Sequence, residues 1–107
     1  MNKTDSIARI ILGWSLNRWD RWYDYETGTF IPAQDFQPEQ NLDHAMLIVK
    51  KLEEYGFTYK QKSDCEVFFD DVCGRGQTLP EAITNAAYTI VERNAVIDSS
   101  RIWATLC

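Results

Sequence analysis

The sequence predicts one α+β domain in which a small antiparallel sheet is sandwiched by helices. Three segments space their apolar residues as amphipathic helices do, and the stretches between them alternate as strands do. A length of 107 residues suits a single domain. We therefore expect the order helix, strand or hairpin, helix, hairpin, helix, with a compact core over about residues 5–94 and a tail over residues 95–107.

The first helix is expected from about Asp5 to Gly13. Thr4 or Asp5 can cap its start, and Gly13 can help to end it. Its apolar residues recur at positions that share one helical face, namely Ile7, Ile10, Ile11 and Trp14. We expect this face to enter the core.

The next segment favours a strand from Arg18 to Tyr25 because it is rich in aromatic residues. Its side chains should alternate between two faces. One face would hold Trp19, Arg21, Tyr23 and Tyr25, and the other would hold Arg18, Asp20, Trp22 and Asp24. A turn around Gly28 then leads to a short return strand at Phe30 and Ile31, which Pro32 stops.

A second helix is expected from about Asn41 to Glu54. Asn41 is a suitable N-cap, and Gly56 follows as the C-terminal stop. The apolar stripe of this helix is formed by Leu42, Ala45, Met46, Val49 and Leu52.

Residues 57–71 then alternate as a hairpin with its turn at Ser63 and Asp64. We expect cross-strand ion pairs that join Lys60 and Lys62 to Glu66 and Asp70. A loop with two glycines follows this hairpin.

The last helix begins with a capping box, in which Thr78 is followed three residues later by Glu81. Its apolar stripe contains small residues that allow close packing on a sheet. The stripe consists of Leu79, Ala82, Ile83, Ala86, Ala87, Ile90 and Val91. In the tail, Ile102 and Trp103 are expected either to dock on the body or to contact a partner, including a second copy of the chain.

The composition excludes several partners. The chain carries 11 basic and 16 acidic residues, for a formal net charge of −5. Long nucleic acid is not expected, because phosphate binding needs a basic surface. Neither a membrane partner nor export is expected, because no apolar run is long enough to span a bilayer and no signal peptide is evident.

Catalytic motifs do not stand out. The single histidine, His44, has no partner that the sequence would orient toward it. The motifs GxSxG, HExxH, CxxC and GxxxxGK[ST] do not occur. We interpret Asp70 and Asp71 as solvated turn residues rather than metal ligands. The sequence therefore predicts a protein without enzymatic activity, metal site or cofactor.

The first candidate site is the aromatic segment. Six of the 14 aromatic residues fall between positions 14 and 30, together with two arginines. Aromatic rings stack on bases while arginine pairs with phosphate, which suits a small nucleotide-like ligand. The residues proposed to bind it are Arg18, Arg21, Trp22 and Tyr23. Two other interpretations stay open, namely a protein interface anchored by Trp, Tyr and Arg, and core packing by Trp19 and Tyr23.

The second candidate site precedes the last helix. Arg75 lies between Gly74 and Gly76, and Gln77 follows Gly76, in the loop that leads to the capping box. Free amides at a helix N-terminus beside an arginine can hold a phosphate. The alternative interpretation is a simple connector.

From Leu42 onward the chain resembles the phage ABA sandwich domain family. The residues that show this are AMLIVKKLEEYGFTYK, the hairpin to FFDD, and GRGQTLPEAITNAAYTIV, with GWSLNRW fitting near the N-terminus. The similarity covers most of positions 5–93. A partial similarity links VFFDDVCGRGQTLPEAITNAAYTIVER to the strand, loop and helix of HicB-type antitoxins, although this chain adds a first helix and inserts residues 41–54.

The resemblance implies a phage or prophage protein in the cytoplasm of a bacterial host, with no catalytic residues to transfer. The leading hypothesis is a counter-defence protein that sequesters a nucleotide-derived immune signal. The alternatives are an acidic, antitoxin-like inhibitor of a host defence protein or nuclease, and a structural accessory phage protein that forms oligomers.

Overall fold

The computed structural model describes residues 2–95, so the predicted contacts of Ile102 and Trp103 lie outside the described residues. The elements are α1 (Lys3–Ile10), β1 (Ser15–Leu16), β2 (Arg21–Asp24), β3 (Thr29–Pro32), the short 3-10 helix η1 (Ala33–Asp35), α2 (Leu42–Glu54), β4 (Tyr59–Ser63), β5 (Glu66–Phe69), β6 (Val72–Arg75) and α3 (Leu79–Ala95). The α+β class and the predicted order of helices and hairpins are confirmed.

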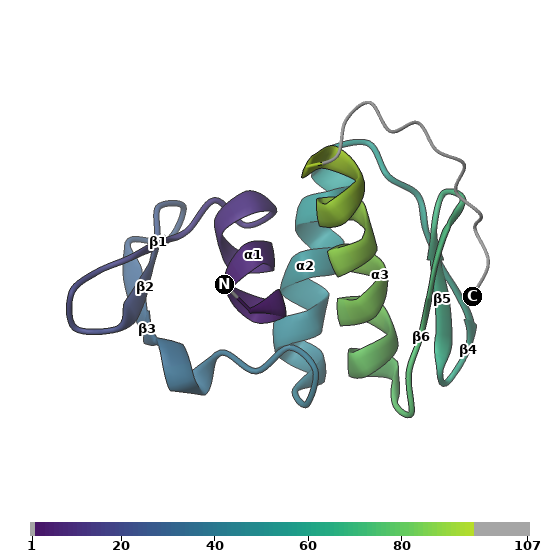
Figure 1. The fold of residues 1–107 in the computed structure, drawn as a ribbon, viewed down its shortest axis with the longest axis horizontal. Helices are drawn as coiled ribbons and strands as arrows, with labels where there is room; N and C mark the ends of the chain where they lie inside the picture. The colour runs from purple at the N-terminus through teal and green to yellow at the C-terminus, as the bar shows by residue number, and fades with distance from the viewer. Residues whose placement is uncertain (1, 96–107) are drawn as a thin grey trace.

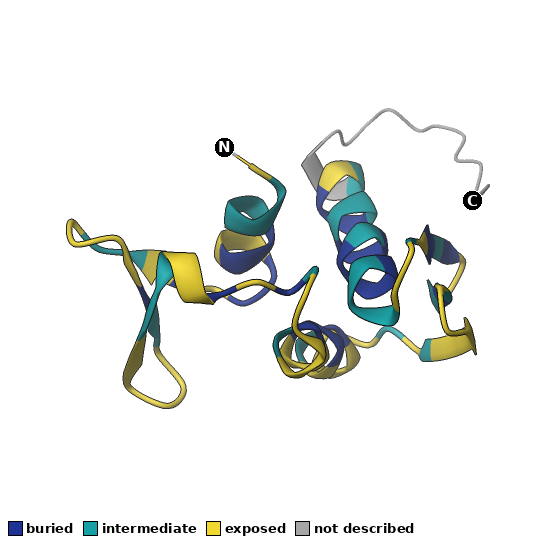
Figure 2. Ribbon diagram, turned by 90° about the horizontal axis from the view of Figure 1, so that it is seen from below, coloured by how far each residue is buried: buried dark blue, intermediate teal, exposed yellow. Residues whose placement is uncertain are grey.

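Within the described residues the strands form two antiparallel sheets rather than the one expected. The first sheet has the order β1-β2-β3 and the second has the order β4-β5-β6. Figure 1 shows the first sheet at one end of the molecule, the second at the other end, and the three helices between them. The helices are therefore the middle of the sandwich. Figure 2 shows that the dark blue, buried residues concentrate on the helices.

The second sheet contains a third strand, β6, where the sequence predicted a loop. Asp70 adopts φ 56 and lets the chain reverse within two residues, so β6 pairs with β5. Aspartate is one of the few residues other than glycine that tolerate this left-handed conformation. The prediction missed β6 because glycines in a short segment indicate a loop more often than a strand.

Packing of β6 against α3 explains its glycine. Gly74 is buried, and a Cβ atom built on it would lie 2.3 Å from the Ala82 carbonyl oxygen and 2.5 Å from the Ala86 Cβ. Both alanines are fully buried members of the predicted apolar stripe of α3. The small residues of that stripe therefore bring the helix and strand backbones into close contact.

The predicted ion pairs between β4 and β5 are wrong. A register shift between Gln61 and Ser63 places Lys60 opposite Phe68 and Ser63 opposite Glu66. Glu66 instead forms an ion pair with Arg75 on β6, where its carboxylate lies 3.7 Å from the guanidinium. The shift arises at a bulge, which sequence alternation cannot reveal.

The predicted N-cap residues of α2 and α3 are observed, whereas those of α1 are not. Asn41 caps α2 as expected, because its side chain accepts hydrogen bonds from Asp43 and His44. The Thr78 cap of α3 is also confirmed, since the Thr78 hydroxyl accepts from the Glu81 amide, whereas the Glu81 carboxylate accepts from the Gln77 amide rather than from Thr78. The α1 prediction is wrong by two to three residues. Asn2 supplies its cap, and the helix ends at Ile10.

A lysine joins the first sheet to the helices. The Lys51 ammonium on α2 contacts Glu26 in the β2–β3 turn and lies 3.3 Å from Glu54. The hydrogen bond to Glu26 raises the pKa of Lys51 above its usual value. This charged contact connects the β2–β3 turn with α2.

We predict that Gly74→Ala destabilises the protein by roughly 2–3 kcal/mol, because the new methyl group forces β6 away from α3. The free energy of unfolding should be measured by urea denaturation. Gly13→Ala is the matched control, since Gly13 has φ +72 and no atom within 4 Å of its would-be Cβ. That variant should lose only about 1 kcal/mol, from backbone strain alone. Equal losses in the two variants would contradict close packing at Gly74.

Candidate functional site

The aromatic segment contains a turn before its strand, so the predicted strand from Arg18 is wrong at its start. The Asn17 side-chain oxygen accepts hydrogen bonds from the Trp19 amide at 2.9 Å and from the Arg21 amide at 3.0 Å. The Asn17 carbonyl accepts from the Asp20 amide at 3.1 Å. Asparagine side chains close turns of this type by replacing a backbone acceptor. The turn leaves Trp19 68% exposed.

Beyond the turn, β2 alternates as predicted. Arg21 and Tyr23 share one face of the first sheet, and Trp22 lies on the other. That second face turns toward the helices, where Trp22 is fully buried and the Arg9 guanidinium of α1 lies 5.3 Å from its ring centroid. Trp22 therefore cannot stack on a ligand in this structure. The interpretation in which Trp19 and Tyr23 form the core is also wrong, because Trp22 takes that role.

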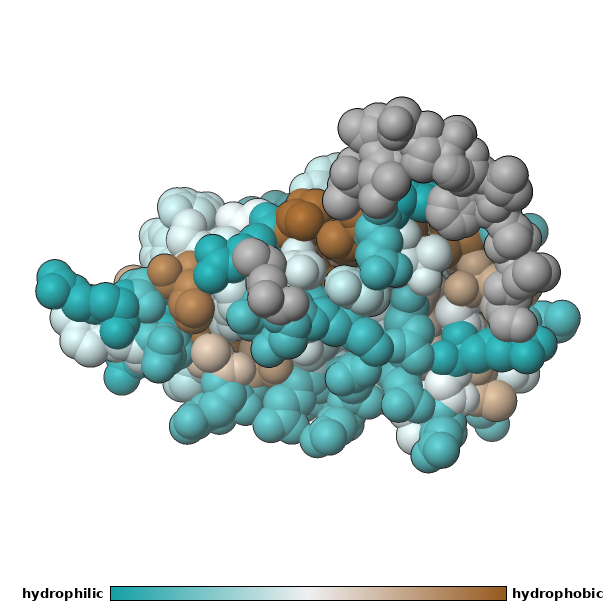
Figure 3. Space-filling view, in the orientation of Figure 1, coloured by the Kyte–Doolittle hydropathy of each residue, from teal (hydrophilic) through white to brown (hydrophobic). Residues whose placement is uncertain are grey.

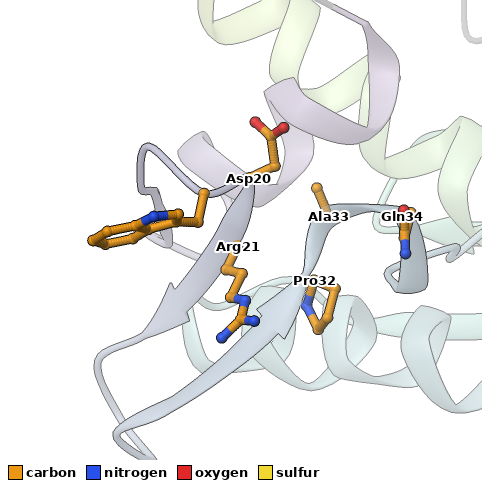
Figure 4. Close-up of a pocket in the computed structure, with 6 residues that line it drawn as sticks. Asp20, Arg21, Pro32, Ala33 and Gln34 are labelled. Carbon is orange, nitrogen blue, oxygen red and sulfur yellow. The ribbon is translucent and has the colours of Figure 1, made fainter.

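A hollow of about 450 Å³ opens where β2 begins and β3 ends. We call it the β2–β3 hollow, and it is lined by Trp19, Asp20, Arg21, Pro32, Ala33 and Gln34. Figure 4 shows Arg21 and Pro32 projecting to one side of the two strands, whereas Asp20 and Ala33 project to the other. Small-molecule sites usually measure roughly 300–1,000 Å³. The hollow has room for a small ligand.

Within residues 2–95, neither Arg21, which lines the hollow, nor Arg18, which precedes Trp19, has a carboxylate partner. The Arg18 guanidinium lies 5.0 Å from the Trp19 ring centroid, which is a cation–π arrangement. Across residues 2–95, neither Arg18 nor Arg21 forms an ion pair, although Arg75 and Arg93 do. Two arginines are thus available to an anion beside an exposed indole.

The second candidate site lies elsewhere. Arg75 ends β6 in the second sheet, at the opposite end of the molecule from the β2–β3 hollow (Figure 1). Its guanidinium faces Glu66, and the Gln77 amide donates to the Glu81 carboxylate. A Cβ on Gly76 would lie 2.7 Å from the Glu81 side chain. A carboxylate of the chain itself therefore occupies the position where a phosphate was expected.

The outer face of the first sheet carries three aromatic residues that contact one another. Tyr23 contacts Tyr25 and Phe30, with ring centroids 4.7 Å and 4.9 Å apart, on the face that carries Arg21. Tyr25 remains 63% exposed and Phe30 54% exposed. We call these three residues the aromatic face. Most of the surface seen in Figure 3 is hydrophilic, with hydrophobic residues in small patches.

The rest of residues 2–95 contains one histidine, His44. His44 accepts a hydrogen bond at Nδ1 from the Gln37 amide and lies against Phe36, away from the β2–β3 hollow. Within that range no group of three or more His, Cys, Asp or Glu side chains is placed to hold a metal ion. None of the helices described is long and apolar enough to cross a membrane.

Asn17→Ala should lower the free energy of unfolding by about 1–2 kcal/mol, because two amides lose their acceptor. The change should be measured by urea denaturation. Asn17→Asp keeps the side-chain oxygen and should retain most of the stability. An alanine variant as stable as the wild type would show that the turn does not depend on this side chain.

Comparisons with known proteins give one match. The model of the phage ABA sandwich domain matches residues 5–88, in agreement with the resemblance seen in the sequence. No curated protein and no solved structure matches the chain. Because the matched segment covers most of its length, the chain belongs to the phage ABA sandwich domain family.

Proposed function

We propose that this phage protein binds a small nucleotide-like ligand in the β2–β3 hollow and thereby sequesters a nucleotide-derived immune signal of the bacterial host. The observation that carries the proposal is the exposed Trp19 ring, which lines the hollow together with Arg21 and has the Arg18 guanidinium over it. The protein would act by holding the signal in the host cytoplasm rather than by converting it.

Stacking is the first part of the argument. Every nucleobase has a flat π face, and its stacking on an aromatic side chain contributes about 1–3 kcal/mol. Trp19 offers such a ring at the rim of the hollow. Its backbone is fixed by Asn17, so little ordering is needed when a ligand binds.

Charge is the second part. The chain has a net charge of −5, so a nucleotide is repelled from most of its surface. Arg18 and Arg21 provide local positive charge that no carboxylate within residues 2–95 pairs with. Arginine binds phosphate oxygens through several N–H donors at once. The phosphate is therefore expected at Arg21, with the base on Trp19.

We revise the set of ligand-binding residues accordingly. Arg18 and Arg21 remain in it and Trp19 joins it, whereas Tyr23 leaves it, because it shares a face of β2 with Arg21 but does not line the hollow. Trp22 supports the site from the core, and Arg75 and Gln77 are too remote to share one ligand with it.

Trp19→Ala and Arg21→Gln should each weaken ligand binding about tenfold or more, because one removes the stacking ring and the other the phosphate partner. Isothermal titration calorimetry against a panel of cyclic nucleotides and cyclic ADP-ribose isomers would measure this. Arg75→Gln is the control, since it removes the same charge at the other end of the molecule and should leave affinity unchanged. Absence of binding by wild-type protein to the whole panel would refute the proposal.

The aromatic face supports a second candidate function, the binding of a host defence protein. Tyrosine and phenylalanine are enriched in protein interfaces, and Arg21 borders the aromatic face. In this case Tyr25→Ala and Phe30→Ala should abolish recovery of a specific partner from host lysate at both low and high salt. Retention of the partner by the double variant would reject the aromatic face as its interface, and unaltered titration of the nucleotide panel by that variant would favour the first proposal.

A further inference from the structure

We infer that Asp20 makes the β2–β3 hollow selective for ligands with a single negative charge, such as a cyclic phosphodiester, over nucleotides with a terminal polyphosphate. The inference rests on the proposed function, because it concerns the nucleotide bound at that site. It names the charge class of the ligand, which the stacking argument leaves open.

The charges around the hollow carry the inference. Asp20 and Arg21 both line it, and Arg18 adjoins it through Trp19. Asp20 forms no ion pair within residues 2–95, so its carboxylate is not neutralised by the chain. The two guanidinium groups and the carboxylate leave a surplus of one positive charge. A phosphodiester carries one negative charge and matches this surplus. Each further phosphate charge is repelled by the Asp20 carboxylate and by the net charge of −5 of the chain.

The backbone fixes Asp20 in place. It adopts φ 59, a conformation that side chains other than glycine, asparagine and aspartate rarely take. Its amide donates to the Asn17 carbonyl, and its own carbonyl accepts from Ala33 at 2.8 Å. Glycine would fit this left-handed position without strain. The backbone therefore holds the Asp20 carboxylate at the hollow in a position that glycine would also fit.

The Asp20 carboxylate can repel a ligand without blocking its site, because the side chain is directed away from Arg21 (Figure 4). Asp20 and Arg21 project to opposite sides of the strands, so the carboxylate does not occupy the position of a phosphate on Arg21. Its effect on a ligand is electrostatic and acts over several ångströms, within the range of about 10 Å that 0.1 M salt permits.

The test compares 3′,5′-cyclic AMP with ATP, in the absence of divalent cations and at low ionic strength, by isothermal titration calorimetry. Wild-type protein should bind cyclic AMP more tightly than ATP. Asp20→Asn removes the charge and keeps a residue that tolerates the left-handed backbone. It should raise the affinity for ATP roughly 3- to 10-fold, and that for cyclic AMP by a smaller factor. Asp20→Gly should shift the ratio in the same direction.

Asp43→Asn is the matched control, because it removes the same charge from the first turn of α2, outside the lining of the hollow. A wild-type protein that binds cyclic AMP no more tightly than ATP overturns the inference. So does a ratio of affinities that changes equally in Asp20→Asn and Asp43→Asn. If cyclic AMP binds but the ratio does not respond to Asp20, only the selectivity fails, whereas failure of the whole nucleotide panel overturns the proposed site as well.

Discussion

Burial of Trp22 is the interaction on which the first sheet and its surface depend. The strands of this sheet are short. The large apolar side chain on its inner face is that of Trp22, which is fully buried beside α1. Leu16 and Ile31, its neighbours across the register, pack against the same core. Side chains alternate along a strand, so an inward Trp22 requires outward Arg21 and Tyr23. The position of the candidate site follows from the packing of its neighbour.

The turn before β2 adds the second constraint. Asn17 supplies a side-chain acceptor to two amides and thereby ends β1, reverses the chain and starts β2. Asp20 accepts a left-handed backbone inside this turn. Strained or sparsely populated conformations persist where surrounding hydrogen bonds over-determine them, and they often accompany binding sites. Here the result is a fixed backbone beneath the exposed indole of Trp19 and beside the two arginines.

The two ends of the molecule use similar residue types for different purposes. In the second sheet Arg75 meets Glu66, and the amide at the start of α3 meets Glu81, so charges and donors are satisfied within the chain. In the first sheet Arg18 and Arg21 lack such partners within residues 2–95. Internal satisfaction favours a structural role at the second sheet. Because the arginines at the first sheet lack such partners, the first sheet is the better candidate for a ligand site.

The sequence by itself determined the α+β class, the order of the elements, the caps of α2 and α3, and the family. These depend on local periodicity and on cap residues that contact only their own helix. Tertiary structure decided that two sheets flank the helices, that β6 exists, and that Trp22 rather than Trp19 is buried. It also separated Arg75 from Arg21. Each of these depends on which face of a short strand meets a distant helix, and short strands of two to five residues carry too few alternations to specify that.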